Sequence, residues 1–583
     1  MKKILYSVAA VALLFTTSCS DFLDRAPQDK LSPSTFWQTE NDAYLALTGV
    51  YNSLNSIYHN GHWTGNNCVM MDCFSDNYFD YFSWEGYTVL TSGNLKPTDT
   101  GFAGSLFTFT DIRACNEYLE MEGNVNWADT KKQAQYAAEA KVVRANLYLY
   151  KSEWYGDFPL VLKTLTLEEA AEVTRAPQAE VRAQVIKDLQ EAIPALPDRL
   201  DQSQGRISKQ FAQGLLMRTY LWHSQYAEAA TQAKAILDYF NQKGIDLNPS
   251  YVGMFEQGKQ YSEDVIFDFA FVANTDREWQ YGAVPFVANG AHGGWSSIIP
   301  TVDLMDEFET LNGLAIDDPA NKMYDPEHPF LNRDPRLRAS MLYPGQQYVG
   351  YEDSQTGCYN PMPKYKADGS NNDDYWQNAN NATKSGLQLG KYFQSANITG
   401  GALQHFSLDF KVMRLAEIIL TLAECDIEQG YLDEAATLIN RVRKRAGMPE
   451  VAADVKASQD KMRALVRRER RVELNGEALR RFDMVRWQVD KDGNWVADGG
   501  TPYIVWKFQN KMAIEHLEGT IENYKDANGD WVAHVTGRVG KNPDDVCAYN
   551  VQNFRTFSER NIFWPVPQGT IDVNPNIKQT VGY

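Results

Sequence analysis

Aromatic side chains in irregular, polar segments are the residues of this sequence best suited to binding chemistry. The 583 residues include 14 Trp and 31 Tyr. The C–H faces of a sugar ring dock on aromatic planes, and Trp and Tyr combine an apolar body with a polar tip. Because large aromatic cores need the same residue types, the composition by itself fits both interpretations.

These aromatics concentrate in segments that lack a helical or strand-like pattern. One segment spans 58–110, and a longer one, rich in Gly, Asn, Pro and Tyr, spans roughly 245–408. Long loops are uncommon in compact domains unless they carry function, and binding residues usually lie on loops of a rigid frame. The glycines of 288–294 would let a ligand come close to Trp295. The side chains of interest are Tyr78, Asp80, Tyr81, Trp84, Trp279, Tyr281, Trp295, Tyr375 and Trp376.

Motifs for catalysis are absent from the sequence. It contains no HExxH metal helix, no GxSxG nucleophile elbow and no phosphate-binding glycine loop. A carboxylate pair of the glycosidase type is defined in space rather than by spacing, so a surface glycoside hydrolase stays an alternative. The stretches 490–497 and 526–533 look superficially like calcium loops but lack the closing Glu of an EF-hand. Their Asp-Gly and Asn-Gly pairs predict β-hairpin turns instead.

The N-terminus has the pattern of an exported lipoprotein. Lys2 and Lys3 precede an apolar run, 4–15, that is too short to span a membrane, and Cys19 follows small residues. This arrangement predicts a signal peptide over 1–18, cleavage before Cys19 and acylation of its thiol, which would hold the chain to a membrane. A plain secretory signal with an incidental cysteine is the alternative. The net charge of −19 argues against nucleic acid as a partner.

The elements that must position these residues are helices. The run 132–154 has helical period and ends at a Gly- and Pro-containing stop. The segments 211–222 and 226–240 predict a helical hairpin with the packing pattern of tetratricopeptide repeats, and 419–442 predicts a second one. Such repeats pack on one another. We therefore expect the two hairpins to meet in space, with the intervening residues inserted between them.

Several motifs occur in order along the whole chain and together resemble the SusD/RagB family. The C-terminal stretch Phe563-Trp564-Pro565-Val566-Pro567 is similar to that family's signature. The further matching stretches are 19–24, 144–145, 155–160, 334–336, 414–417, 440–447, 470–474 and 480–487. The basic run that begins at Arg463 alternates with Glu469 and Glu473, which predicts i±4 or i±3 ion pairs that join neighbouring helices. The tryptophans within helical or motif segments are expected in the core, and they are Trp154, Trp222, Trp487 and Trp564.

The resemblance implies a mainly α fold, in which a tetratricopeptide-like scaffold carries a large, irregular inserted region and a few short β-hairpins. It implies a non-enzymatic lipoprotein on the outer face of the outer membrane, anchored through Cys19, that captures oligosaccharide or polysaccharide and delivers it to a TonB-dependent transporter. It allows a structural calcium ion but names no ligands. The expected division is a signal peptide at 1–18 and one domain at 19–583, with scaffold at about 25–57, 105–240 and 409–583 and binding loops at about 58–104 and 245–408.

The resemblance also ranks the candidate glycan contacts. Family members often place binding aromatics in the early loop, which puts Trp84 first, together with Tyr78, Asp80 and Tyr81. Trp295 comes next, followed by Trp279, Tyr281, Tyr375 and Trp376. Each aromatic could instead be a buried anchor of its loop. A peptide-binding member of the same fold is the second alternative.

Overall fold

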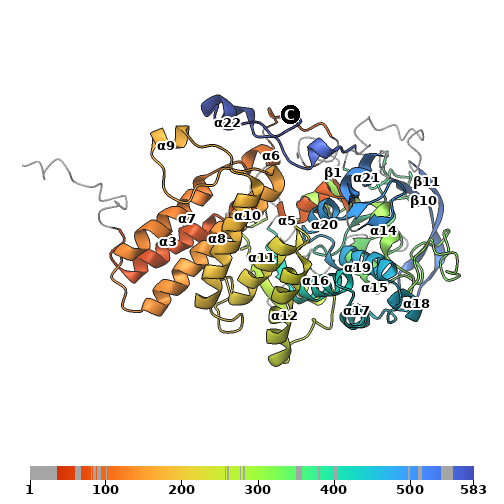
Figure 1. The fold of residues 1–583 in the computed structure, drawn as a ribbon. Coiled ribbons are helices and arrows are strands. Elements are labelled where there is room, and N and C mark those ends of the chain that lie inside the picture. The colour runs from red at the N-terminus through yellow and green to blue at the C-terminus, as the bar shows by residue number, and fades with distance from the viewer. Residues whose placement is uncertain are drawn as a thin grey trace, which may run out of the picture.

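The computed structural model describes a largely helical molecule (Figure 1). The described residues are 36–58, 67–80, 82, 87, 93–99, 101–256, 258, 262–275, 278–279, 282–348, 357–377, 381–394, 397, 405–496, 499–509, 515–539 and 556–583. Among them, no helix is both long and apolar enough to cross a bilayer.

The N-terminal helices form one end of the scaffold. They are α3 (Glu40–Asn52), α7 (Thr110–Met121), α8 (Thr130–Tyr155) and α10 (Gln178–Ala192). The predicted helix of 132–154 is α8. It begins where the Asp129 side chain accepts hydrogen bonds from the Lys131 and Lys132 amides, and it ends at Gly156, whose φ of 70° favours glycine. Helix α8 packs against α3, α7 and α10.

The two predicted hairpins exist and pack together. The first is α11 (Lys209–Leu221) with α12 (Tyr226–Gln242), and the second is α16 (Leu415–Glu428) with α17 (Leu432–Ala446). Helix α12 packs directly on α16, although about 170 residues lie between them in the sequence. In Figure 1 these helices continue the row that the orange N-terminal helices begin. The tetratricopeptide-like scaffold is therefore confirmed.

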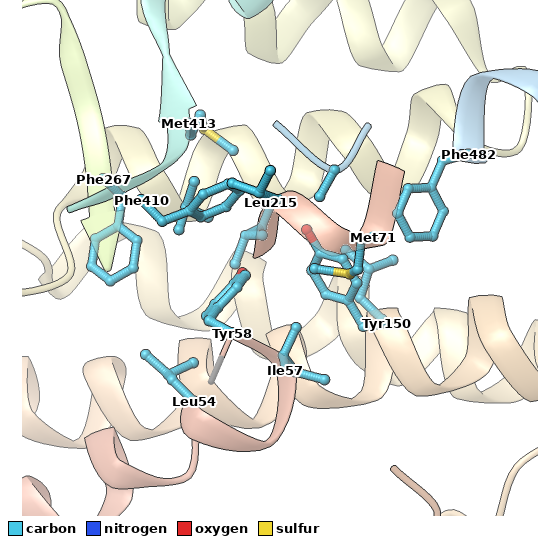
Figure 2. Packing of buried hydrophobic residues seen from close by; sticks show 14 of the residues in the cluster. Leu54, Ile57, Tyr58, Met71, Tyr150, Leu215, Phe267, Phe410, Met413 and Phe482 are labelled. Carbon is cyan, nitrogen blue, oxygen red and sulfur yellow. The ribbon is translucent and has the colours of Figure 1, made fainter. Parts of the chain in front are cut away.

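An antiparallel strand pair connects the inserted region to the scaffold, and a buried ion pair joins two scaffold helices beside it. Strand β2 (Val265–Phe269) pairs with β6 (Phe410–Arg414), which runs directly into α16. The Arg218 guanidinium of α11 donates to Glu417 of α16 at 2.7 Å, with both side chains buried. Figure 2 shows how Phe267, Phe410 and Met413 of the strands pack toward Leu215 and Tyr58. The inserted region therefore leaves the scaffold and returns to it next to the β2–β6 strand pair.

The inserted region itself contains short elements joined by loops. Its strands are β3 (Ile298–Pro300), β4 (Met341–Leu342) and β5 (Gln388–Leu389), and its helices are α13 (Asn289–His292), α14 (Val302–Glu307) and α15 (Pro335–Ser340). The remaining short helices are α4 (Asn55–Tyr58), α5 (Asn67–Met70), α6 (Phe102–Ser105), α9 (Leu167–Ala171), α18 (Ala453–Lys456) and the 3₁₀ turns Met71–Phe74, Glu122–Asn124, Ile193–Ala195, Gly253–Phe255, Val284–Phe286 and Glu559–Asn561.

The C-terminal part adds the four helices α19 to α22 and two small sheets. Helices α19 (Gln459–Leu474) and α20 (Arg480–Arg486) are followed by the sheet of β7 (Gln488–Val489), β8 (Trp495–Val496) and β9 (Thr501–Pro502) and by α21 (Tyr503–Gln509). A long hairpin of β10 (His516–Lys525) and β11 (Trp531–Val539) comes next, and then α22 (Gln568–Val573). Residues 490–494 and 526–530, within the two stretches predicted to be hairpin turns, connect β7 to β8 and β10 to β11.

Helix α19 lies in a network of buried ion pairs. Glu473 accepts from Arg414 at 2.7 Å and from Arg336 at 3.2 Å, and it also pairs with Arg445. Burial alone would raise the pKa of Glu473, but the guanidinium groups of Arg445 and Arg414 hold it well below its usual range. Glu469 and Glu473 join neighbouring elements as predicted, but not through the predicted i±4 or i±3 pairs. Their partners lie on other elements rather than within α19.

The four tryptophans expected in the core are all buried. Trp154 of α8 stacks on Trp564 with a centroid separation of 4.2 Å, and the Trp564 amide donates to the Trp154 carbonyl at 2.7 Å. The Pro-flanked C-terminal stretch is thereby fixed along the helical scaffold.

Candidate functional site

Strand pairing brings the early loop segment next to the segment that carries Trp295. Strand β1 (Tyr78–Asp80) pairs antiparallel with β3, so that Asp80 lies opposite Ile298. The Thr301 amide and hydroxyl donate to the Asn77 and Asp76 carbonyls at 2.9 and 2.7 Å. Two segments that are about 220 residues apart in the sequence are therefore joined in one small sheet.

A second link holds the Trp295 segment to the Tyr375 segment. The Gly290 amide donates to Oδ1 of Asp374 at 3.0 Å. A Cβ at Gly290 would lie 2.3 Å from Oδ2 of Asp374, so only glycine allows this approach. We call the surface formed by residues 289–295 and 364–377 the loop face.

The loop face presents partly exposed aromatic rings. Trp295 and Tyr375 are both half-buried. The backbone of Trp295 is held in place because its amide donates to the Val284 carbonyl at 2.8 Å. Polar side chains lie on the same two segments: Asn289 is half-buried, Asp373 is exposed, and the Asn289 side chain donates to the Asp373 carbonyl at 3.5 Å. This combination suits a ligand that has both apolar C–H faces and hydroxyl groups.

Tyr365 is an aromatic of the loop face that the sequence reasoning missed. It is 53% exposed, and the Lys364 ammonium lies 5.2 Å from its ring centroid. It forms a β-bridge with Asn371 across a tight turn at Asp368-Gly369. The Asp-Gly pair was the available signal, because it marks a hairpin whose flanking residues face solvent.

Two predicted contact residues of the inserted region are buried instead. Trp279 is 1% exposed and lies within 6 Å of the ring centroids of five aromatic side chains, and its indole donates to the Leu408 carbonyl at 2.9 Å. Trp376 is 5% exposed and packs on His516, whose pKa burial lowers to about 3. Neither ring offers a free face to a ligand. The Trp279 and Trp376 side chains instead pack in the protein interior and support the loops that carry them.

Tyr78 and Asp80 are also buried. The Tyr78 hydroxyl donates to Asn475 at 3.1 Å, and burial raises its pKa well above the usual value. The Asp80 carboxylate accepts from the Phe82 and Tyr87 amides, each at 3.1 Å. Their expected role as direct contacts is therefore replaced by a supporting one, in which the Asp80 carboxylate links the Phe82 and Tyr87 amides to β1.

Four predicted residues lie outside the described residues, namely Cys19, Tyr81, Trp84 and Tyr281. Asp80 and Tyr87 bracket the first-ranked candidate, Trp84. Within the described part of the chain, no group of three or more His, Cys, Asp or Glu side chains is arranged to hold a metal ion.

Comparisons with known proteins cover nearly the whole chain. A family model described as "SusD family" matches residues 254–583, and one described as "Starch-binding associating with outer membrane" matches residues 21–221. SusD-like protein P25 of Formosa agariphila is 24% identical over 514 residues, which are 84% of this chain and 90% of the relative. A SusD-like protein of Bacteroides ovatus is 24% identical over 513 residues, 84% of this chain and 83% of the relative.

Solved structures share the fold. A SusD-like carbohydrate binding protein from Bacteroides fragilis is 27% identical, with a TM-score of 0.73 over 93% of this chain and 100% of that chain. A laminarin binding SusD-like protein is 20% identical, with a TM-score of 0.63 over 94% of this chain and 100% of that chain.

Proposed function

The chain belongs to the SusD family, and from this premise we propose that it is a cell-surface glycan-binding lipoprotein. It captures oligosaccharide or polysaccharide on its loop face and delivers the glycan to a partner TonB-dependent outer-membrane transporter. The proposal extends to this chain what the printed names of two similar structures say of those proteins, carbohydrate binding and laminarin binding.

The arrangement of Trp295 and Tyr375 is the observation that carries the proposal. Both rings are half-buried, so each is held in place while part of it stays accessible. The Gly290–Asp374 hydrogen bond fixes their segments relative to each other. Because fixed platforms lose little conformational entropy on binding, they suit a ligand that makes several modest contacts along its length.

Two described carboxylates near the candidate aromatics, Asp80 of β1 and Asp374 of the loop face, have structural roles. Glycosidases need one carboxylic acid and one carboxylate on either side of the scissile bond. Asp80 and Asp374 are buried and accept hydrogen bonds from backbone amides, so both serve as structural acceptors. We therefore assign no catalytic step to these two carboxylates.

The outer-membrane location and the anchor rest on the sequence and on the matched family description. Residues 21–221 match the model described as starch-binding and associating with the outer membrane. Acylation of Cys19 would hold the mature chain to that membrane. The proposed orientation faces the cell exterior, where polysaccharide is available for capture.

Affinity electrophoresis tests the proposal. Wild-type protein is run in native gels that contain individual polysaccharides, beside Trp295→Ala and Tyr375→Ala. Tyr431→Ala is the matched control, because Tyr431 is 55% exposed but lies outside the loop face. We expect retardation by at least one polysaccharide that both loop-face variants weaken and the control keeps. Binding of peptides but no glycan would favour the peptide-binding alternative, and release of oligosaccharide products would favour a hydrolase.

A further inference from the structure

Three aromatic rings form a row beside the small sheet of β7, β8 and β9, outside the loop face. Between ring centroids, Trp495 of β8 lies 4.7 Å from Tyr503 of α21, and Tyr503 lies 5.7 Å from Trp506. Trp495 and Trp506 are both half-buried. A Cβ at Gly493 of the β7–β8 turn would come within 2.3 Å of the Trp506 indole, so the backbone of this turn lies against the ring. Both tryptophans are therefore held in place while part of each stays accessible.

The guanidinium of Arg467 lies against this row, between two indoles. Its Cζ is 4.2 Å from the ring centroid of Trp495 and 4.8 Å from that of Trp487, and Arg467 is 5% exposed. Nε and Nη1 are buried without a hydrogen-bond acceptor, whereas Nη2 is not enclosed in this way. Among the buried arginines that the structure describes, only Arg467 makes neither a hydrogen bond nor an ion pair with another protein group.

The carboxylates that attract Arg467 electrostatically, Glu424 and Glu428, are held by other arginines. Glu424 accepts from Arg486 at 2.6 and 2.7 Å, and Glu428 accepts from Arg463 at 2.6 and 2.8 Å. Burial, together with the neighbouring charge of Arg486, lowers the pKa of Arg467 to about 10. A positive charge is thus enclosed in the fold without a carboxylate of its own.

The two indoles do not satisfy this guanidinium. An aromatic ring attracts the face of a guanidinium through its quadrupole, but the N–H groups point outward in the guanidinium plane. Buried donors that lack an acceptor are costly, and an ion that binds at such a group is one reason for which a fold keeps it. A guanidinium edge suits a carboxylate or a sulfate in particular, because its N–H groups form a planar fork.

We propose that Arg467, Trp495 and Trp506 form a second saccharide site, which takes a sugar that carries an acidic group. The carboxylate or sulfate of the sugar accepts from the Arg467 guanidinium, and a C–H face of the ring packs on the accessible part of an indole. The exposed amide of Asn494, in the adjoining turn, is available to a hydroxyl group. A neutral sugar would leave the guanidinium unpaired. The inference rests on the proposed function in taking a saccharide as the ligand, but it concerns a separate site.

Calorimetry with the mature, full-length chain tests this inference. The probes are two matched pairs, namely trigalacturonate with its methyl ester, and sulfated dextran oligosaccharide with unmodified dextran oligosaccharide. We expect the acidic member of at least one pair to bind at least about tenfold more tightly than its neutral counterpart, and added salt to weaken it. The pair that shows the preference identifies the acid group as carboxylate or sulfate.

Variants of Arg467 separate ligand binding from a structural role. Arg467→Met should lose the preference for the acidic saccharide, and Arg467→Lys should keep part of it. Arg113→Met is the matched control, because Arg113 is exposed on α7. Since Arg467→Met removes an unpaired buried charge, we expect its thermal midpoint to equal or exceed that of wild type. The acidic saccharide should raise the midpoint of wild type but not that of Arg467→Met.

The outcomes also separate this site from the loop face. Trp506→Ala should weaken binding of the acidic saccharide, whereas Trp295→Ala should leave it unchanged. Loss of that binding in Trp295→Ala would overturn the inference, as would equal affinities within both pairs or an unchanged preference in Arg467→Met. Binding of inorganic sulfate at Arg467 without binding of any saccharide would replace the inference with a simple anion site. Failure of the proposed function appears differently, as absence of polysaccharide binding to the loop face.

Discussion

At the scale of single residues, the loop face depends on one glycine. Gly290 lets its backbone amide reach the Asp374 carboxylate, and the buried carboxylate has no space for a neighbouring methyl group. The hydrogen bond connects the loop of Trp295 to the loop of Tyr375. The two proposed binding platforms are therefore linked through the backbone of Gly290.

Replacing this glycine should weaken glycan binding without unfolding the protein. In Gly290→Ala the new Cβ forces the two loops apart, and we expect affinity to fall about tenfold, since a misplaced platform loses its contact. Gly569→Ala is the matched control, because a Cβ there meets no atom within 4 Å. Affinity gels and thermal melts measure both effects. Wild-type affinity in Gly290→Ala would contradict the coupling.

The sequence could predict which tryptophans are structural but not which ones are exposed. Trp154 and Trp564 lie in a periodic helix and in a Pro-flanked motif, and both are buried as predicted. Trp279 and Trp295 both lie in segments of the sequence that lack a helical or strand-like pattern. They differ in burial because the Trp279 amide and indole donate to the Phe406 and Leu408 carbonyls, which lie about 130 residues further along the sequence. No local pattern records a partner at that separation.

At the scale of elements, buried ion pairs join the scaffold helices to one another. Glu424 of α16 accepts from Arg486 of α20 at 2.6 and 2.7 Å and from the Trp487 indole at 2.7 Å. Burial raises the pKa of Glu424, but Arg486, together with Arg470 and Arg467, outweighs burial and lowers the pKa from 4.5 to about 2. The charged form is therefore favoured by folding.

This pKa shift predicts how stability depends on pH. Because the folded pKa is below the unfolded one, the contribution of Glu424 is complete above about pH 4.5 and is lost as the pH falls toward 2. Glu424→Gln should lower the free energy of unfolding by about 3–5 kcal/mol at pH 7, since it leaves Arg486 buried beside a neutral side chain. Urea unfolding across pH 2–7 measures this. A variant with the wild-type pH slope would contradict the assignment.

The C-terminal segment should also contribute to scaffold stability. Trp564 stacks on Trp154 and is 1% exposed, so Trp564→Ala leaves a cavity and should cost about 3–5 kcal/mol. Val573→Ala in the same segment is the control, because Val573 is 86% exposed. Equal urea midpoints for the two variants would show that the segment does not brace the helices.

At the scale of the whole molecule, the helical scaffold could be predicted from the sequence more completely than the loop segments. Repeat spacing and the turn pairs Asp-Gly and Asn-Gly are local signals, and the hairpins α11–α12, α16–α17 and β10–β11 formed where they indicated. The convergence of the loop segments relies on the β1–β3 pairing and on the Gly290–Asp374 bond, both of which are long-range. The candidate site was therefore predicted as a set of segments, but its accessible residues required the structure.

The proposed anchor makes a prediction for the molecule in its cell. Cys19→Ala removes the thiol that acylation requires, so the exported chain should move from the membrane fraction to the soluble fraction. Labelling with palmitate, together with cell fractionation, measures this. Label incorporation or membrane retention in the variant equal to wild type would contradict an anchor at Cys19.

The most direct test of the central claim is calorimetric titration of a retained polysaccharide into wild-type protein and the double variant Trp295→Ala/Tyr375→Ala, with product analysis of the same samples. We expect wild type to bind, the double variant to lose at least about tenfold in affinity, and the polysaccharide to remain intact. Equal affinity in the two proteins would contradict a binding site on the loop face, and shortened chains would contradict a receptor that binds without cutting.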